Sequence, residues 1–280
     1  MRARLILLVV AALAAAGGAQ ARARTQSCDR PSAYAGATEQ NAASLSQLDW
    51  SPFGRAEKGW EIYAPKVADA IRTRCAPDTP GFAAALAHWQ RRNHLAAKGR
   101  FDAATFDVLK SGWQGRRSFV TLRASGACPD APDLSDLAAA GPEESDGGKI
   151  ILLRPAALAA LRRMVAAAKV AVPEAAADPE RLMLFSGFRS PADDAARCEA
   201  EANCNGVVRA QCSAHRTGLA VDLVMGAAPG SSVDSSADAN RLWQTQTATY
   251  RWLVANARRY GFVNYVFEPW HWEWTGPAPR

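Results

Sequence analysis

Histidine is scarce in this sequence, with only four among 280 residues. An imidazole-based site must therefore draw on very few positions. The longest apolar run, residues 5–16, is shorter than the roughly 20 residues that cross a bilayer, so it does not predict a membrane span. The sequence also lacks an internal repeat and a dense stripe of Lys and Arg, and the missing stripe argues against nucleic-acid binding.

The N-terminus has the pattern of a secretory signal peptide over residues 1–23. Arg2 and Arg4 precede the apolar run, and small-residue cleavage patterns end at Ala21 and Ala23. We therefore expect an exported, periplasmic or cell-wall-associated protein. Cleavage would remove Arg2 and Arg4, and Arg22 as well at the later site, lowering the net charge from +6 to +4 or +3. This modestly basic balance favours an acidic polymer such as peptidoglycan as partner.

Six cysteines in an exported protein favour disulfides over free thiols. Three lie on each side of residue 149, so full pairing requires at least one bridge between the two halves. A zinc site built from the last three is the alternative, but they contain no close Cys-x-x-Cys pair. The six are Cys28, Cys75, Cys128, Cys198, Cys204 and Cys212.

Length and composition predict two domains joined by a linker. The acidic stretch 128–148 is rich in Pro and Gly and reads as that linker. It separates a helical domain, residues 28–127, from a larger α+β domain with an antiparallel sheet, residues 149–276. The larger domain begins with an apolar segment and an alanine-rich amphipathic helix over residues 155–171.

The smaller domain centres on a predicted helix pair. Phe82, Leu86 and Trp89 recur at helical spacing, and Asp102 is placed to cap a second helix that follows Gly99. This stretch resembles the helical peptidoglycan-binding domain often attached to cell-wall hydrolases, although Lys98-Gly99 stands where that domain usually has Asp-Gly. A helix hairpin that only packs on the catalytic domain is the rival interpretation.

Two segments of the larger domain carry the chemistry. The first runs Ser213-Ala-His215-Arg-Thr-Gly218-Leu-Ala-Val-Asp222, and the second runs Glu268-Pro-Trp-His271. Residues 219–224 and 262–267 are apolar and β-branched or aromatic, so each segment adjoins a predicted strand. Catalytic zinc takes three protein ligands and keeps one position open, which two imidazoles and one carboxylate satisfy.

These residues also have plain structural interpretations. A single His or Asp beside a strand is usually a hydrogen-bonded core residue or a turn cap. Two of the four histidines nevertheless fall in these segments, whereas His88 and His94 lack an acidic partner at ligand spacing and are predicted to be structural. Trp270, Trp272 and Trp274 occur at every second position. In an extended segment this spacing places their side chains on one face, which favours core packing over a role in the wall of a cleft.

The pattern Ser-x-His-x-x-Gly-x-Ala-x-Asp followed by Glu-x-x-His resembles the zinc D-alanyl-D-alanine peptidases of the VanY and VanX type, in the lysostaphin, DD-peptidase and hedgehog group. Every fixed position is met. That family also has a Ser-Gly-Tyr-Arg-Ser segment, matched here by residues 186–190 with Phe188 in place of Tyr and Arg189 in register. The resemblance covers residues 149–276.

The resemblance implies one Zn²⁺ held by His215, Asp222 and His271, with Glu268 as general base. It implies that Arg189 stabilises the oxyanion or the substrate carboxylate and that Ser213 contacts substrate, although a hydroxyl that caps the turn before His215 explains Ser213 equally well.

The function expected is removal of terminal D-Ala from peptidoglycan stem peptides by an exported, monomeric D,D-carboxypeptidase. Pro269, rather than a second Trp, places the sequence nearer the carboxypeptidase branch. The alternatives are a D,D- or L-Ala-D-Glu endopeptidase with the same zinc site, and a zinc-containing cell-wall binding protein without activity. An intact Glu268 and Arg189 argue against the last, since a binding protein needs no base beside its metal.

Overall fold

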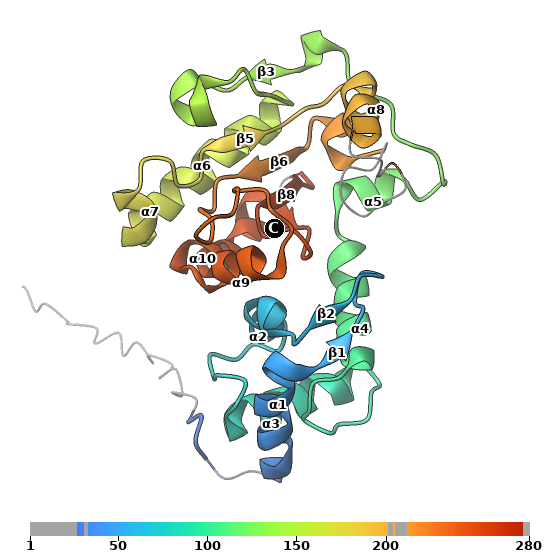
Figure 1. The fold of residues 1–280 in the computed structure, drawn as a ribbon, viewed down its shortest axis with the longest axis vertical. Helices are drawn as coiled ribbons and strands as arrows, with labels where there is room; N and C mark the ends of the chain where they lie inside the picture. The colour runs from blue at the N-terminus through green and yellow to red at the C-terminus, as the bar shows by residue number, and fades with distance from the viewer. Residues whose placement is uncertain (1–26, 31–32, 201–203, 205–211, 277–280) are drawn as a thin grey trace, which may run out of the picture.

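The computed structural model describes residues 27–30, 33–200, 204 and 212–276. The expected signal peptide lies outside these residues. Figure 1 shows a helical N-terminal part, coloured blue to green, and a C-terminal part, yellow to red, built around a sheet. Helices and small antiparallel sheets together confirm the predicted α+β class. None of the helices described has both the length and the apolar character needed to cross a membrane.

The N-terminal part is mainly helical, with one short hairpin. Its elements are α1 (Ala35–Gln47), β1 (Asp49–Trp50), β2 (Glu57–Lys58), the 3₁₀ helix η1 (Glu61–Tyr63), α2 (Ala64–Ala70), α3 (Pro80–Arg92), α4 (Ala103–Gln114) and α5 (Ser118–Leu122). The helix pair predicted from the sequence corresponds to α3 and α4. The Asp102 carboxylate accepts a hydrogen bond from the Thr105 amide at 2.9 Å, which confirms the predicted cap.

Aromatic side chains form much of the N-terminal core. Phe82, Leu86 and Trp89 of α3 are buried as their spacing predicts. The Trp60 ring stacks on Phe101 with 4.1 Å between centroids. Offset ring stacking adds to the free energy gained by burying these large surfaces. The same core includes Val266 of the C-terminal part, so it extends across the contact between the two parts.

The C-terminal part is built on a four-stranded antiparallel sheet of order β5-β6-β8-β7. Its strands are β5 (Leu184–Ser186), β6 (Ala220–Leu223), β7 (Phe262–Asn264) and β8 (His271–Trp274), and a two-stranded sheet is formed by β3 (Ala138–Ala139) and β4 (Leu152–Leu153). Its helices are α6 (Pro155–Ala171), α7 (Pro173–Ala177), α8 (Pro191–Ala200), α9 (Asp238–Gln246) and α10 (Ala248–Asn256). Its 3₁₀ helices are η2 (Leu134–Asp136), η3 (Pro142–Glu144), η4 (Asp146–Gly148), η5 (Ala214–Thr217) and η6 (Ala257–Tyr260).

Alternation along two central strands separates the core from the candidate site. Val221 and Leu223 of β6 and Trp272 of β8 join the core formed with α6 and α10. Because successive strand residues point to opposite faces, Asp222 and His271 point away from that core. They are direct partners in the β6–β8 register. Trp270, Trp272 and Trp274 all pack in or against the core, as the core interpretation of their spacing predicts.

The second site segment differs from its predicted form. The strand expected over residues 262–267 ends at Asn264, and a turn follows in which the Glu268 amide donates to the Tyr265 carbonyl at 2.9 Å. His271 is the first residue of the next strand, β8, in the stretch whose alternating tryptophans predicted an extended segment. A tight reversal between β7 and β8 thus places Glu268 beside His271.

The stretch expected as a linker, residues 128–148, packs with the C-terminal part. β3 pairs with β4, and Ala140 belongs to the C-terminal core. Ser145 forms a parallel bridge with Leu184 of the main sheet. Short 3₁₀ turns account for the Pro and Gly residues that suggested a linker.

All six cysteines are paired, as Cys28–Cys75, Cys128–Cys212 and Cys198–Cys204. The second pair joins the two halves of the sequence, as the odd count on each side requires. It also anchors the residue directly before Ser213. Because no thiol is left free, the alternative zinc site of three cysteines is wrong.

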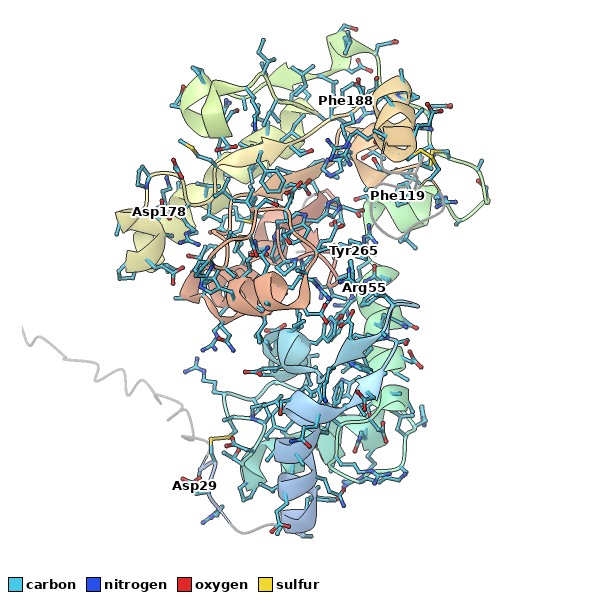
Figure 2. All side chains as sticks on the ribbon, in the orientation of Figure 1. Asp29, Arg55, Phe119, Asp178, Phe188 and Tyr265 are labelled. Atoms are coloured by element: carbon cyan, nitrogen blue, oxygen red, sulfur yellow. A yellow bond between two sulfur atoms is a disulfide. The ribbon has the colours of Figure 1, made fainter. Side chains whose placement is uncertain are left out.

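The N-terminal and C-terminal parts share buried polar contacts. Arg241 of α9 donates to the Tyr63 hydroxyl at 2.6 Å and pairs with Glu57 at 3.2 Å, with both charged side chains almost wholly buried. Arg117, just before α5, pairs with Glu273 of β8. Figure 2 shows Arg55 and Tyr265 in the region where the two parts meet. The helical part therefore contacts the strand that carries His271.

Candidate metal centre

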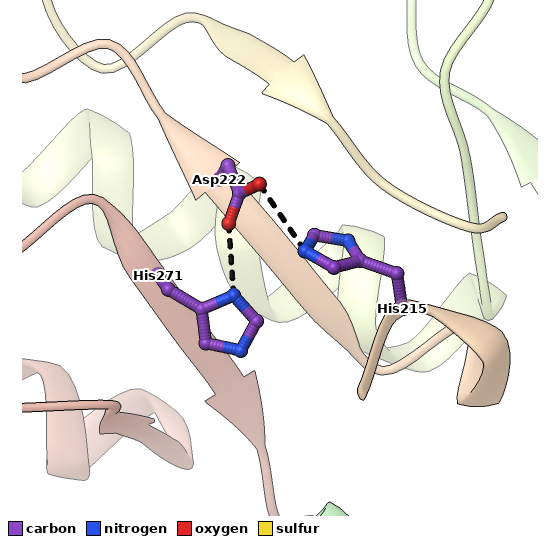
Figure 3. Close-up of side chains that lie close together, drawn as sticks. All are labelled: His215, Asp222 and His271. Carbon is purple, nitrogen blue, oxygen red and sulfur yellow. Dashed lines mark hydrogen bonds and ion pairs between the residues drawn. The ribbon is translucent and has the colours of Figure 1, made fainter. Parts of the chain in front are cut away.

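His215, Asp222 and His271 converge on one point (Figure 3). The Nε2 atom of His215 lies 3.1 Å from one oxygen of Asp222, and the Nδ1 atom of His271 lies 2.9 Å from the other. The three candidate ligand atoms lie within 4.8 Å of one another. All three side chains are buried. The structure thus brings together the three residues named from the sequence as metal ligands.

Local sequence explains how His215 enters the site. It lies in η5, and the chain leaves this turn through Gly218 at a φ of +66°, a backbone region that side chains with a Cβ rarely adopt. The Thr217 hydroxyl donates to the Ala214 carbonyl at 2.7 Å and accepts from the Leu219 amide at 3.0 Å. These bonds fix the turn immediately before β6, so His215 is held close to Asp222.

Each imidazole has a partner for its second nitrogen. The His215 Nδ1 atom lies 2.7 Å from the Gly187 carbonyl oxygen, which accepts its proton and leaves Nε2 free to bind a cation. The His271 Nε2 atom lies 3.3 Å from Glu273. Metal-binding histidines almost always donate their other N–H to such a partner. Two imidazole nitrogens, one carboxylate and these outer contacts fit a divalent cation such as zinc.

The charges inside the site are uneven. Burial disfavours ionisation of Asp222, but the neighbouring His215 and His271 outweigh it and hold the pKa of its carboxyl well below the usual range. Burial, assisted by the charge of Arg189, lowers the pKa of His215. Burial also acts against a charged His271, yet its bonds to Asp222 and Glu273 raise the pKa of that imidazole to about 9. At neutral pH the three candidate ligands, without a metal, are therefore one carboxylate, one neutral imidazole and one imidazolium.

Glu268 lies beside the three candidate ligands. One of its carboxylate oxygens is 3.9 Å from His271 Nδ1, compared with 2.9 Å for the oxygen of Asp222. Burial raises the pKa of Glu268 to about 7, and the charge of Asp222 adds to the rise. A carboxyl that titrates near neutrality can take up and release a proton under physiological conditions. Glu268 thus has the position and the pKa of an acid–base group.

Arg189 and Ser213 belong to a cluster that also contains Asp194. The Arg189 Nε atom lies 3.1 Å from Asp194, and one of its terminal nitrogens lies 3.4 Å from the Ser213 hydroxyl. That hydroxyl in turn donates to Asp194 at 2.8 Å. Asp194 is only 2% exposed, so it orients both side chains from a fixed position.

Sequence reasoning missed two buried carboxylates at the site, Asp194 and Glu273. Glu273 could have been found, because a residue two positions after His271 on a strand points to the same face. Asp194 carries no comparable signal, since it reaches Ser213 only through the folding of α8. The remaining histidines, His88 and His94, are exposed and lie outside the site.

Gly187 is expected to tolerate no side chain. A Cβ at this position would lie 2.5 Å from Ile151 Cγ2 and 2.7 Å from the Leu152 carbonyl, so Gly187→Ala must displace the segment that accepts from His215. We expect a loss of about 1–3 kcal/mol in unfolding free energy, measured in urea. Gly112→Ala is the matched control, because its Cβ meets nothing within 4 Å inside α4 and should stabilise slightly. Equal stability of the Gly187 variant and the unmodified protein would contradict the steric argument.

The C-terminal part of the chain is similar to known peptidases. The family model for VanY, described as D-alanyl-D-alanine carboxypeptidase, matches residues 150–277. The chain is also similar to the LdcB LD-carboxypeptidase, whose structure is described as revealing the molecular basis of peptidoglycan recognition. That likeness has 27% identity and a TM-score of 0.39, covering 53% of this chain and 72% of the other. No curated protein matches significantly. The match of residues 150–277 to the VanY family model confirms the resemblance seen in the sequence.

Proposed function

We propose that this protein is a zinc-dependent D,D-carboxypeptidase that removes the terminal D-Ala from peptidoglycan stem peptides. The observation that carries the proposal is the meeting of His215, Asp222 and His271 beside Glu268, inside the residues matched by the VanY family. A purely structural metal site does not need an acid–base group beside its ligands. The presence of Glu268 beside this cluster therefore supports a catalytic role.

The metal would be held by Nε2 of His215, the Asp222 carboxylate and Nδ1 of His271. These are the atoms that face one another, while the second nitrogen of each imidazole is occupied elsewhere. Three protein ligands leave a further position open, as in catalytic zinc sites. Zinc bound there would polarise the peptide carbonyl and lower the pKa of a water molecule.

Glu268 would move the proton in this reaction. Its pKa of about 7 allows it to accept a proton from the attacking water and later to give that proton to the departing amine. Its greater distance from His271 Nδ1, compared with Asp222, supports a role outside the ligand set. We propose Glu268 as the general base and acid.

Arg189 and Ser213 would position the substrate. A guanidinium stays charged at every working pH and presents several donors to a carboxylate or an oxyanion. Its Nε contact with Asp194 fixes the plane of Arg189, and the same carboxylate accepts from the Ser213 hydroxyl. Both side chains are thus oriented before a substrate arrives, which lowers the ordering cost of binding.

The domain and compartment assignments complete the proposal. We propose a signal peptide at residues 1–23, a helical peptidoglycan-binding-like domain at 28–127, a connecting stretch at 128–148 and the catalytic domain at 149–276. Three disulfides support an exported, periplasmic or cell-wall-associated protein. Peptidoglycan is the proposed partner of the monomer.

Purified muropeptides test this function directly. We expect the zinc-loaded protein to remove one terminal alanine from pentapeptide stems, with the products identified by mass spectrometry. A chelated sample should be inactive and should recover when zinc is restored. Release of monomers from cross-linked dimers would instead establish a D,D-endopeptidase. Cleavage between L-Ala and D-Glu would establish an L-Ala-D-Glu endopeptidase. Binding to sacculi without any cleavage would indicate a cell-wall binding protein without enzymatic activity.

A further inference from the structure

Glu273 is a buried carboxylate with an unusual set of donors. It is 1% exposed and lies on the same face of β8 as His271. Both the Nε and a terminal nitrogen of Arg117 lie 2.6 Å from its Oε1, and the Phe119 amide donates to its Oε2 at 2.8 Å. The remaining contact is His271 Nε2, 3.3 Å from Oε1. One carboxylate thus joins the helical part of the chain to a candidate metal ligand.

We propose that Glu273 is a positioning residue for the metal site and that Arg117 holds it in place, so that the helical part of the chain completes the site. The inference rests on the proposed function for the metal and goes beyond it. The helical part then acts on the proposed zinc site through Arg117 and Glu273, in addition to any binding of the cell wall.

The tautomer of His271 gives the first reason. A metal bound at Nδ1 requires the ring proton to remain on Nε2. Glu273 accepts from that position, which fixes both the tautomer and the rotation of the ring. A carboxylate behind a ligating imidazole also increases the electron density available to the metal.

The cost of burial gives the second reason. A carboxylate removed from water loses several kcal/mol of hydration free energy unless charged or hydrogen-bonding partners replace it. Arg117 supplies that partner from a position 156 residues earlier in the sequence. Without its guanidinium, Glu273 would lose its two closest donor contacts and turn toward water, and the bond to His271 would weaken.

The packing of Arg117 gives the third reason. Its guanidinium lies 4.0 Å from the centroid of the Tyr265 ring, and that ring meets the His271 ring edge-on at 5.9 Å. Ser118 donates from its hydroxyl to the Trp274 carbonyl, so the start of α5 is bound to the end of β8. Arg117 is therefore confined between Glu273 and Tyr265, both of which touch His271.

Two conservative variants of the full-length protein test this arrangement. Glu273→Gln keeps the shape and removes the charge, whereas Arg117→Lys keeps the charge and removes the planar fork. We expect Glu273→Gln to weaken zinc binding about 10- to 100-fold and Arg117→Lys to weaken it by a smaller factor, of roughly threefold or more. Affinity is measured by competition with a chelator at alkaline pH, where protons do not compete for the imidazoles.

Arg162→Lys is the matched control. Arg162 forms a two-pronged pair with Glu144 at 2.7 Å, but this pair is exposed and belongs to η3 and α6 rather than to the site. Zinc affinity of the control should stay within about twofold of that of the unmodified protein. A nitrogen NMR spectrum of metal-free protein provides a second measurement, since Glu273→Gln should change the signal of His271 Nε2 and the control should not.

The possible results are distinguishable. The inference would be overturned if the folded Glu273→Gln protein bound zinc with unchanged affinity and differed only in a lower unfolding temperature. The Arg117–Glu273 pair would then have only a structural role. If Glu273→Gln does not fold, Arg117→Lys decides by the same criterion. An unmodified protein that binds zinc but cleaves no muropeptide would reject the proposed activity without affecting the inference. An unmodified protein that binds no zinc would reject both.

Discussion

Replacing Glu268 with Gln is expected to reduce kcat for muropeptide cleavage by about 10³-fold or more while zinc remains bound. General acid–base groups contribute about 10²- to 10⁴-fold, and here one side chain would serve both transfers. Gln cannot take up the proton, although it matches Glu in size and hydrogen-bonding shape. The three proposed ligands remain intact, so the metal content should not change.

Metal analysis and steady-state kinetics on the same preparation separate the two effects. Glu180→Gln is the control, since Glu180 is exposed and distant in sequence from both site segments. Loss of zinc from Glu268→Gln would place Glu268 among the ligands. Unchanged turnover in a zinc-loaded variant would assign the proton transfer to another group.

The sequence predicts the centre of the site well because its residues lie in short, regular segments. Alternation along β6 places Asp222 opposite the core residues Val221 and Leu223, and the apolar neighbours that establish this alternation are visible in the sequence. The helix boundaries at Asp102 and Pro155 are equally local, since a cap and a proline act within one turn.

The surroundings of the site depend on contacts between distant segments. No periodicity in the sequence relates Arg117 to Glu273, because the pairing exists only when α5 lies against β8. Asp194 likewise reaches Ser213 only after α8 packs beside the turn before η5. Such contacts depend on tertiary packing, and a single sequence does not encode them in its spacing.

The stretch from 128 to 148 shows a second limit of composition. Pro and Gly mark places where helices and strands end, but they do not reveal whether the intervening chain packs against a core. Here β3 pairs with β4, and Ala140 is buried. The Cys128–Cys212 bridge adds a covalent constraint beside Ser213. The stretch thus connects the two parts and also packs on the C-terminal core, which its composition does not reveal.

The loss of one proton from His271 is expected to raise zinc affinity about tenfold for each pH unit between pH 7 and 9, and this contribution should level off above pH 9. In the metal-free site, contacts with Asp222 and Glu273 outweigh burial and raise the pKa of His271 to about 9. Its imidazole is therefore protonated at pH 7 and must release one proton before Nδ1 binds zinc. The pKa of Asp222 is lowered, so its carboxyl is already ionised at pH 7. The pKa of His215 is also lowered, so its imidazole is already neutral. Neither group therefore releases a proton when zinc binds.

Calorimetry in buffers of different ionisation enthalpy counts the protons released on zinc binding. The measurement uses Glu268→Gln protein, because Glu268, with a pKa of about 7, would otherwise contribute a proton of its own. We expect His271 to account for about one proton at pH 7 and about a quarter of a proton at pH 9.5, with water bound to the zinc adding to both counts. His88→Ala, which removes an exposed imidazole from α3, should leave both counts unchanged. Zinc binding at pH 7 without proton release would mean that His271 is neutral in the metal-free protein, and then its bonds to Asp222 and Glu273 could not be those of an imidazolium.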